Sequence, residues 1–319
     1  MKLGIIMDPI SGINIAKDST FAMLLEAQAR SWDIYYMEMD DLFLVNDIPS
    51  ATTRKMTVED EASRWYQFHQ AMTLSLFDLD VILMRKDPPF NMEYIYTTYL
   101  LELAHRQGTL VVNDPASLRD ANEKLFVSWF PQCTTPTLVA RKSEHILAFL
   151  DEHRDIILKP LDGMGGASVF RVQLAEQNTN VIIETLTENG AKHVMVQQFI
   201  PEIVNGDKRI LMINGEPVPY ALARIPKEGE IRGNLAAGGS AKGVELTDRD
   251  RWICEQLSPT LKEKGLMFVG IDVIGDYLTE INVTSPTCVR ELDTIYNLNI
   301  AGDLMDAIEQ QIAETGNNH

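Results

Sequence analysis

Residues 156–171 read IILKPLDGMGGASVFR, and this stretch decides how the chain folds. Short runs suited to strands, at residues 156–158 and 168–171, flank a glycine-rich turn, which predicts two strands joined by a loop. Glycine lets backbone N–H groups approach phosphate oxygens closely, and Lys159 adds a positive charge beside them. The loop has neither the G-K-[ST] ending of a Walker loop nor a Rossmann fingerprint. The pattern indicates a phosphate-binding loop, with a plain hairpin as the alternative.

A second motif lies at residues 269–282, which read VGIDVIGDYLTEIN. A tight turn at Gly275-Asp276 would pair two strands and bring Asp272 beside Glu280 and Asn282, which share one strand face. Carboxylates and an amide in otherwise apolar strands are costly to bury without partners. Hard oxygen ligands of this kind suit Mg²⁺. The motif therefore predicts a magnesium site, in preference to a solvated hairpin face.

The rest of the chain shows two patterns of secondary structure. Up to about residue 120, strands alternate with helices, which predicts a parallel α/β sheet. We expect strands at 3–7, 34–37, 81–84 and 110–112, helices at 20–30, 62–76 and 94–107, and a polar stretch at 46–60. Beyond residue 156 the expected strands are closely spaced, which predicts antiparallel α+β modules with strands at 156–158, 168–171, 194–198, 209–213, 218–224, 267–272 and 277–283. Asn214-Gly215 is expected to form a further hairpin turn.

Residues 226–243 carry five glycines and little periodicity. A loop of this length inside a compact domain is usually functional or disordered. Because few apolar side chains other than Leu235 could anchor it to a core, we expect a mobile lid that orders over a ligand. Loops at the ends of the N-terminal strands, at residues 8–19, 85–91 and 113–117, are further candidates for a site.

Composition excludes several classes of protein. With 45% hydrophobic and 23% charged residues in 319, the chain has the composition of a folded protein of two or three domains. Its 28 Lys+Arg against 46 Asp+Glu leave a formal net charge of −18, which repels nucleic acids and anionic membrane surfaces. We expect neither as a partner. Anionic small molecules would require local clusters of positive charge.

The cysteine pattern bears on the compartment. Cys133, Cys254 and Cys288 lie far apart without a C-x-x-C spacing, which argues against a disulfide framework and a zinc cassette. We expect a reducing cytoplasm. No signal-peptide core and no run of about 20 apolar residues is found, so we expect the chain to be neither exported nor embedded in a membrane. The six histidines show no ligand spacing and are expected to be structural or solvated.

Several motifs, taken in their order, resemble one family. They are the strand-Lys-Pro run, the D-G-M-G-G-A-S loop, the later arginine-bearing strands, the R-G-N-L-A-A-G-G segment and the D…E-I-N-V-T-S-P-T run. Together with M-D-P at 7–9 and R-K-D-P-P at 85–89, they resemble the ATP-grasp superfamily, specifically the bacterial glutathione synthetases. The resemblance covers essentially the whole chain and implies an ATP-grasp fold, mixed α/β and α+β, with an N-terminal parallel α/β (pre-ATP-grasp) domain.

The resemblance also implies a division of the chain. Residues 1–122 would form an N-terminal α/β substrate-binding domain, and residues 123–200 an ATP-grasp lid subdomain with the phosphate loop. Residues 201–319 would form a C-terminal ATP-grasp subdomain that carries the Mg²⁺ site and the mobile loop 226–243. A homotetramer is the oligomer that the resemblance suggests.

Roles for the nucleotide and metal residues follow from the same resemblance. Nucleotide phosphates would be held by two lysines and by the small loop, namely Lys124, Lys159, Gly163, Gly165, Gly166 and Ser168. Adenine would bind backbone groups of the hinge at 197–200, which includes Gln198, Phe199 and Ile200. Asp207 would contact the nucleoside. The family's Mg²⁺ ligands are matched by Asp272, Glu280 and Asn282. The resemblance implies two ions with Glu280 as a bridge between them, and Mn²⁺ could replace Mg²⁺.

The substrate residues are implied in the same way. Arg209 and Arg224 would face the peptide substrate from strands, while Arg232 and Asn234 would reach it from the lid. Carboxylate binding would fall to a turn and to an arginine at the end of an N-terminal strand, namely Ser285, Pro286, Thr287 and Arg85. The chain departs from the family pattern at Ser240, where a basic residue is often found, and in the charged segment 227–231.

The implied activity is that of an enzyme that joins γ-glutamylcysteine and glycine through an acyl phosphate, with ATP and Mg²⁺. One alternative is another ATP-grasp carboxylate-amine ligase, similar to D-alanine-D-alanine ligases or to glutamate-adding enzymes. A second is an ATP-binding module without catalysis. The full set of lysine, carboxylate and amide residues weakens the second alternative.

Overall fold

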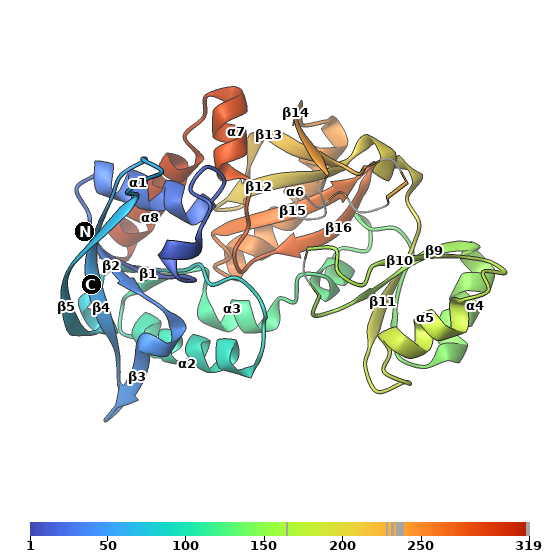
Figure 1. The fold of residues 1–319 in the computed structure, drawn as a ribbon, viewed down its shortest axis with the longest axis horizontal. Helices are drawn as coiled ribbons and strands as arrows, with labels where there is room; N and C mark the ends of the chain where they lie inside the picture. The colour runs from blue at the N-terminus through green and yellow to red at the C-terminus, as the bar shows by residue number, and fades with distance from the viewer. Residues whose placement is uncertain (164, 228, 231–232, 234–238, 317–319) are drawn as a thin grey trace.

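The computed structural model describes residues 1–163, 165–227, 229–230, 233 and 239–316. Its N-terminal part is a seven-stranded sheet with the order β3-β4-β2-β1-β6-β7, in which β5 also pairs with β4 (Figure 1). The parallel centre confirms the predicted α/β sheet and consists of β1 (Lys2–Ile6), β2 (Asp33–Met37), β6 (Val81–Met84) and β7 (Leu110–Val112).

Three helices of this part begin at a polar N-cap, as their sequences suggest. Asp18 accepts a hydrogen bond at the start of α1 (Ser19–Ala29), Asn91 at the start of α2 (Met92–Arg106) and Asp114 at the start of α3 (Pro115–Asp120). α1 packs on one face of the sheet, and α2 and α3 pack together on the other (Figure 1). The helices predicted at 20–30 and 94–107 are therefore confirmed.

The expectations for residues 46–60 and 62–76 are wrong. The first stretch contains β4 (Ile48–Val58), which pairs with β3 (Leu42–Val45), and the second contains β5 (Tyr66–Ser75) in place of a helix. Tyr66, Phe68, Met72 and Leu74 are partly buried at even positions, which is a period of two and therefore the pattern of a strand. Buried Thr53 satisfies its hydroxyl by donating to the carbonyl of Met72, so a polar sequence can form this interior strand.

The middle of the chain forms a separate four-stranded antiparallel sheet with the order β10-β9-β11-β8. Its core contains ten buried apolar residues and lies beneath α4 (Ser143–His153) and α5 (Thr179–Leu186). The glycine-rich turn joins β9 to β10, as predicted. The strands are β8 (Thr137–Ala140), β9 (Asp155–Pro160), β10 (Phe170–Gln173) and β11 (Val194–Gln198).

The third sheet has five antiparallel strands with the order β14-β13-β12-β15-β16. Both predicted hairpins are confirmed: Asn214-Gly215 joins β12 (Asp207–Ile213) to β13 (Glu216–Ile225), and Gly275-Asp276 joins β15 (Phe268–Ile274) to β16 (Tyr277–Asn282). Asn214 and Gly215 adopt the positive φ angles that such a turn requires. β14 (Ser240–Glu245) forms the edge beyond β13.

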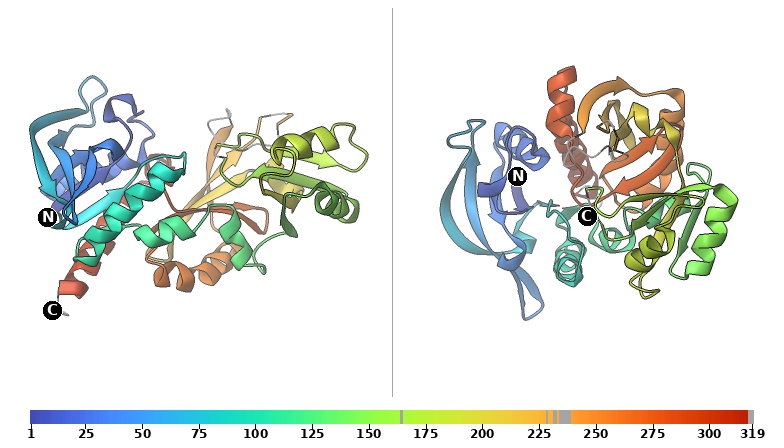
Figure 2. Two further views of the ribbon diagram at one scale, coloured as in Figure 1. Left: turned by 90° about the horizontal axis from the view of Figure 1, so that it is seen from below. Right: turned by 45° about the vertical axis from the view of Figure 1, so that its right-hand side comes forward.

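Three helices complete the fold. α6 (Asp248–Glu263) begins with a capping box between Thr247 and Asp250, and α7 (Val289–Tyr296) follows the third sheet. α8 (Ile300–Gly316) then returns to the N-terminal sheet and packs against α1 (Figure 2). Residues expected to belong to the C-terminal subdomain therefore cover the N-terminal one. The 3₁₀ segments are η1 (Ile10–Gly12), η2 (Met39–Asp41), η3 (Leu76–Asp78), η4 (Leu125–Trp129) and η5 (Pro201–Asn205).

The expected loop at 226–243 is shorter than predicted, because residues 240–243 belong to β14 and pair with β13. A Cβ on Gly233 would overlap the carbonyl oxygen of Arg224, so a glycine is required where this segment passes β13. The lid hypothesis otherwise falls largely on positions outside the described ranges, including Arg232 and Asn234. Across the described parts of the chain, no helix is both long and apolar enough to cross a bilayer.

Candidate active site

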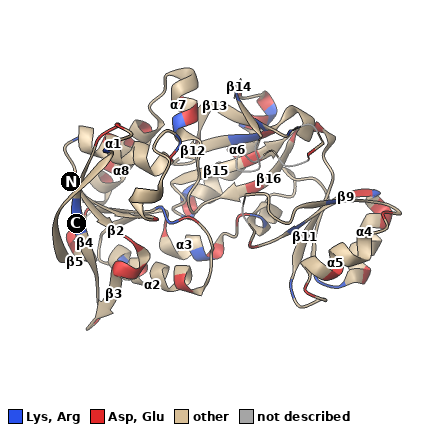
Figure 3. Cartoon of the chain, viewed as in Figure 1, with Lys and Arg blue, Asp and Glu red and all other residues tan. Residues whose placement is uncertain are grey.

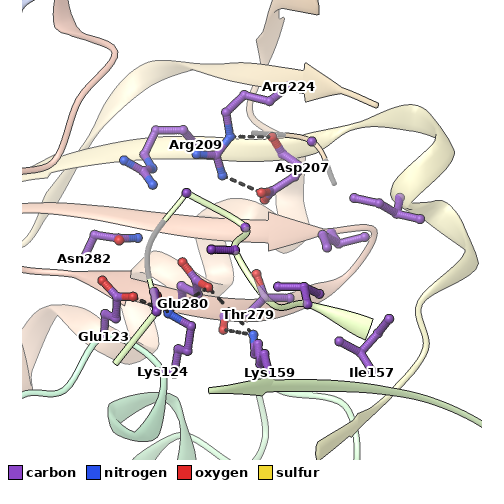
Figure 4. Close-up of a pocket in the computed structure, with 18 of the residues that line it drawn as sticks. Glu123, Lys124, Ile157, Lys159, Asp207, Arg209, Arg224, Thr279, Glu280 and Asn282 are labelled. Carbon is purple, nitrogen blue, oxygen red and sulfur yellow. Dashed lines mark hydrogen bonds and ion pairs between the residues drawn. The ribbon is translucent and has the colours of Figure 1, made fainter. Parts of the chain in front are cut away.

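A cavity of about 360 Å³ lies where the middle and the third sheets face each other (Figure 4). This volume is in the range of small-molecule sites. Its walls come from the glycine-rich loop between β9 and β10, the end of β11 and the β12, β13 and β16 strands. They include fifteen of the residues predicted for a site: Lys124, Lys159, Gly163, Gly165, Gly166, Gln198, Phe199, Ile200, Asp207, Arg209, Arg224, Glu280, Asn282, Ser285 and Thr287.

Two buried lysines approach the cavity from the side of the glycine-rich loop. Lys159 lies on β9 and donates to the carbonyl oxygen of Thr279 at 3.3 Å, while Lys124 donates to that of Gly163 at 2.5 Å. Their ammonium groups lie 3.9 and 3.6 Å from the same carboxylate oxygen of Glu280. The loop adds Gly165 and Gly166, which have positive φ angles and line the cavity. The sequence thus brings two cations and a glycine loop to one wall.

The two lysines differ in their electrostatics. Burial lowers the pKa of Lys159, and the charge of Glu280 only partly offsets this effect. Burial also opposes the charge of Lys124, but the carboxylates of Glu280 and Glu123 raise its pKa above the ordinary value. Glu123, which was not predicted, forms a close ion pair with Lys124. The only feature of the sequence that could have identified Glu123 as a site residue is its position immediately before Lys124.

The facing wall is one face of the third sheet, with charges in a row across it. Register places Asp272 of β15 opposite Arg209 of β12 and Glu280 of β16, and Asn282 lies on the same face as Glu280. Arg209 donates to both carboxylate oxygens of Asp272, at 2.5 and 2.9 Å. Although burial opposes its ionisation, the guanidiniums of Arg209 and Arg224 hold the pKa of Asp272 well below its usual range.

Asp207 and Arg224 form a second buried pair on this wall (Figure 4). Arg224 donates to Asp207 at 2.5 Å and lies 2.9 Å from Asp272, so one guanidinium serves two carboxylates. Burial raises the pKa of Asp207 to about 7, against the opposing charge of Arg224. The second carboxylate oxygen of Asp207 is buried and has no hydrogen-bond partner among the residues described.

The predicted metal residues fit Mg²⁺ by the chemistry of their donors, which are two carboxylates and an amide. Glu280 is part-exposed to the cavity, and its distances to the lysines leave its oxygens available. The oxygens of Asp272 accept from arginines, and the amide nitrogen of Asn282 lies 3.4 Å from one of them. Within the described ranges, no three His, Cys, Asp or Glu side chains are grouped to hold a metal by themselves. Phosphate oxygens of a nucleotide would have to complete the coordination.

One end of the cavity is apolar. Ile157, Ile203 and Ile274 line it beside the hinge of Gln198, Phe199 and Ile200. Sequence reasoning missed these three isoleucines. A signal existed for one of them, because Ile157 alternates with the core residues Ile156 and Leu158 on a strand that is apolar on both faces.

Some predicted residues lie elsewhere. Ser168, Asp272 and Pro286 do not line the cavity, and Asp272 is buried behind its wall. Buried Arg85 does not line it either, and its guanidinium donates to Thr20 and, at 2.8 Å, to the carbonyl of Pro286. Its third nitrogen, Nη1, has no partner in the part of the chain that the structure describes. Arg85 thus supports the turn at 285–287 from behind.

Charge in the cavity differs from charge in the whole chain. Acidic and basic residues are interspersed along the fold (Figure 3), with an overall excess of acid. Among the described residues that line the cavity or lie directly behind it, four side chains are basic and five are carboxylates. The basic ones are Lys124, Lys159, Arg209 and Arg224, and the carboxylates are Asp87, Glu123, Asp207, Asp272 and Glu280. Positive charge nearly offsets negative charge at this site, which can therefore accept an anionic ligand in a strongly acidic protein.

Comparison with known families agrees with this architecture. Residues 1–119 match the family model described as prokaryotic glutathione synthetase, N-terminal domain, and residues 123–297 match the model of its ATP-grasp domain. Among solved structures, the D-cycloserine synthetase DcsG is similar over 98% of this chain and 100% of its own, with a TM-score of 0.67 and 14% identity. The ATP-grasp ligase PsnB is similar over 98% of both chains, with a TM-score of 0.62 and 16% identity. These likenesses support the ATP-grasp fold.

Similarity to curated relatives is much closer. The glutathione synthetase of Vibrio vulnificus (strain CMCP6) is 60% identical over 312 residues, which are 98% of both chains. That of Escherichia coli O127:H6 is 59% identical over 314 residues, covering 98% of this chain and 99% of the relative. That of Pseudomonas putida is 58% identical over 312 residues, or 98% of both chains. With two family models in chain order and relatives of this similarity over nearly their full length, the chain belongs to the prokaryotic glutathione synthetase family.

Proposed function

We propose that the chain joins γ-glutamylcysteine to glycine and forms glutathione, ADP and phosphate from ATP. The observation that carries the proposal is the meeting of two walls in one cavity. A glycine loop with Lys124 and Lys159 lies on one side, and a face with Glu280, Asn282 and two arginines lies on the other. This arrangement supports positioning and charge neutralisation, which phosphoryl transfer requires more than acid or base catalysis.

The nucleotide would occupy the side of the phosphate loop. Lys124, Lys159 and the backbone of the loop that includes Gly163, Gly165, Gly166 and Ser168 would hold the phosphates of ATP and of the departing ADP. Adenine would lie against the apolar end, between Ile157 and Ile274, and bind backbone groups of the hinge. Asp207 would contact the nucleoside.

The acidic face would hold magnesium. Asp272, Glu280 and Asn282 would be the protein ligands, and we assign to Glu280 a bridge between two ions, with Mn²⁺ as an alternative. The metal would supply positive charge that screens the phosphate oxygens during transfer. Binding it would require Asp272 to share its oxygens between metal and arginines, or to exchange one for the other.

The second anionic substrate would meet the arginines. Arg209 and Arg224 would orient the carboxylates of the peptide, with Ser285, Thr287 and the backbone of the turn as further donors. Arg85 would position that turn through its bond to Pro286, in place of a direct contact. Arg232 and Asn234 remain proposed substrate residues of the segment that would close over the site.

The chemistry has two steps. An oxygen of the cysteinyl carboxylate attacks the γ-phosphorus of ATP, the bond to the bridging oxygen of ADP breaks, and an acyl phosphate forms. The amine of glycine, having lost a proton, then attacks the acyl carbon, and phosphate leaves with the carboxylate oxygen. No covalent enzyme intermediate is needed, so the three cysteines, which are buried and free, need not act as nucleophiles.

Substrate dependence tests the proposal. The protein is incubated with ATP, Mg²⁺ and glycine together with a panel of γ-glutamyl dipeptides and D-amino acids, and phosphate release and product mass are followed. We expect phosphate and glutathione only with γ-glutamylcysteine and glycine. Release that depends on a D-amino acid would identify another ATP-grasp ligase, and nucleotide binding without release would identify a non-catalytic module.

An isotope tests the acyl phosphate separately. When the cysteinyl carboxylate carries ¹⁸O, one labelled oxygen should appear in the released phosphate, since the C–O bond of the acyl phosphate is the one that breaks. Label in AMP, or unlabelled phosphate beside glutathione, would contradict this intermediate without contradicting the ligation.

A further inference from the structure

Glu123 is a carboxylate of the active-site cavity to which the proposed chemistry gives no role. It lines the cavity, and its side chain is 22% exposed. Figure 4 shows it beside Lys124, with Glu280 and Asn282 close by. Two partly buried carboxylates that lie near each other repel unless a cation is shared between them. The cation here is Lys124, whose side chain is only 4% exposed.

The ammonium group of Lys124 has three N–H bonds, and two of them have acceptors among the described residues. One donates to the carboxylate of Glu123 and another to the carbonyl oxygen of Gly163, at 2.5 Å. An oxygen of Glu280 lies 3.6 Å away, which is beyond hydrogen-bonding distance. Glu123 thus satisfies the lysine without engaging Glu280, and the third N–H bond is left for a phosphate oxygen.

Backbone hydrogen bonds fix the place of Glu123 in the cavity. Its carbonyl oxygen accepts from the N–H group of Ile281 at 2.8 Å, and Ile281 is the neighbour of Glu280 on β16. The preceding residue, Asn122, donates from its side chain to the carbonyl oxygen of Leu161 at 3.0 Å, just before the glycine-rich loop. This short segment therefore joins the two walls of the cavity, and the fold sets the position of Glu123 relative to Glu280.

The second lysine of this wall is held away from Glu280 in a different manner. Lys159 lies 3.9 Å from Glu280 and donates instead to the carbonyl oxygen of Thr279, so its acceptor belongs to the backbone. Lys124 depends on a side chain. Burial and the charge of Glu280 raise the pKa of Glu123, and the ammonium of Lys124 opposes this rise, as expected for two carboxylates that share one cation. Without Glu123, the lysine would be left with Glu280 as its carboxylate partner.

We propose that Glu123 is a positioning residue, which holds the ammonium group of Lys124 and thereby leaves the carboxylate of Glu280 to bind a metal ion. A lysine that paired with Glu280 would neutralise it and occupy an oxygen that Mg²⁺ requires. The inference rests on the proposed function through the roles given there to Lys124 and Glu280. It adds a competition between two carboxylates for one ammonium group, which Glu123 wins in the arrangement described.

Nucleotide binding with and without metal tests the proposal. The affinity for ADP is measured by calorimetry in excess Mg²⁺ and in EDTA, and the ratio of the two affinities is the response to metal. Glu123→Gln keeps the volume of the side chain and should lower this ratio about tenfold or more, as the loss of a residue that orients a metal ligand does. Glu216→Gln removes the same charge from an exposed Glu–Lys pair at the start of β13 and should leave the ratio unchanged.

A double variant separates positioning from direct binding of the metal. Glu123→Gln/Lys124→Gln also removes the competing ammonium group, so the ratio should recover toward the wild-type value even though ADP binds more weakly in both conditions. A ratio that stays low in the double variant would overturn the proposal, as would a wild-type ratio in Glu123→Gln or equal losses of affinity in Mg²⁺ and in EDTA.

These measurements also separate the inference from the proposed ligation. They involve no peptide and no glycine, so a protein that joins other substrates would give the same expected ratios. A wild type that binds ADP with no response to Mg²⁺ would contradict the proposed metal site, and this inference with it. A wild type that responds to Mg²⁺ as strongly as Glu123→Gln does would overturn the inference alone.

Discussion

Glu280 is the carboxylate of the site that lies close to both buried lysines. Two lysines lie within 4 Å of one of its oxygens, at 3.6 and 3.9 Å, yet neither is at hydrogen-bonding distance. Under the proposed function, a carboxylate so placed among the described residues would bind a metal ion together with phosphates. Burial lowers the pKa of Lys159, and the negative charge of Glu280 raises it. Glu280 therefore helps to keep Lys159 protonated.

Glu280→Gln should abolish ligation while leaving the fold intact, because one negative charge is lost with no change in volume. We expect kcat to fall about a hundredfold or more, as when a preorganised electrostatic partner is removed. Glu245→Gln, on exposed β14, is the matched control and should retain full activity. Near-wild-type activity of Glu280→Gln at saturating Mg²⁺ would remove this residue from the metal site.

Arg224→Ala should weaken binding of the peptide far more than binding of ATP. The guanidinium lies among two carboxylates at 2.5 and 2.9 Å and is proposed to add a substrate carboxylate, so its loss should cost about a hundredfold in peptide affinity by calorimetry. Arg209→Ala should behave in the same direction. Arg64→Ala, on an exposed turn, is the control. Equal losses for peptide and nucleotide would instead indicate that the arginine only maintains the wall.

At the level of elements, the contact between α2 and α3 depends on one ionised carboxylate. A hydrogen bond from Arg119 lowers the pKa of Glu102, and a second from Arg106 adds to the effect. A carboxyl group whose pKa is lowered by folding stabilises the protein above its unfolded pKa, and this contribution is lost as the pH falls through the folded value.

Glu102→Gln should therefore reduce the free energy of unfolding by about 1 kcal/mol at neutral pH. The difference from the wild type should shrink as the pH falls below the ordinary glutamate range of about 4.3, where both proteins are neutral at this position. Urea unfolding at several pH values measures it. A difference that is independent of pH would show that the side chain acts through packing.

The sequence predicted these elements unevenly, for physical reasons. Tight turns such as Asn214-Gly215 carry local signals, and the alternation around Glu280 and Asn282 placed both on one face correctly. β5 was mistaken for a helix because residues 69–71 are all exposed and interrupt its alternation, so the period of two is faint. The β4 strand was taken for a polar stretch because its buried Thr53 is satisfied by a carbonyl of the partner strand, which the sequence of β4 does not show.

The partners of the site residues were harder to predict than the residues themselves. The pairing of Arg209 with Asp272 depends on β12 lying next to β15, which is a property of sheet order and not of either strand. The burial of Arg85 behind the turn at Pro286 joins residues 201 positions apart. Such contacts arise from topology, about which local periodicity says nothing.

At the scale of the molecule, α8 ties the third sheet to the N-terminal one. Its buried residues pack with α1 and with β12, and Arg30 of the segment after α1 pairs with Asp306 at 2.6 Å. Leu304→Ala should lower the free energy of unfolding by about 2–5 kcal/mol, since it opens a cavity in a fully buried contact. Exposed Gln310→Ala on the same helix should leave it unchanged. Equal midpoints in urea for both variants would mean that α8 adds little to the N-terminal unit.

The position of α8 also has a consequence for the nascent chain. Domains generally fold from the N-terminus while synthesis continues. Here the apolar face of α1 stays uncovered until α8 has been translated, because α8 is the helix that covers it. In chain order α8 comes after every other described element. During that interval the unit that is made first keeps an uncovered surface, which is the kind that chaperones bind. Interrupted translation before residue 300 would leave this surface permanently open and mark the fragment for degradation.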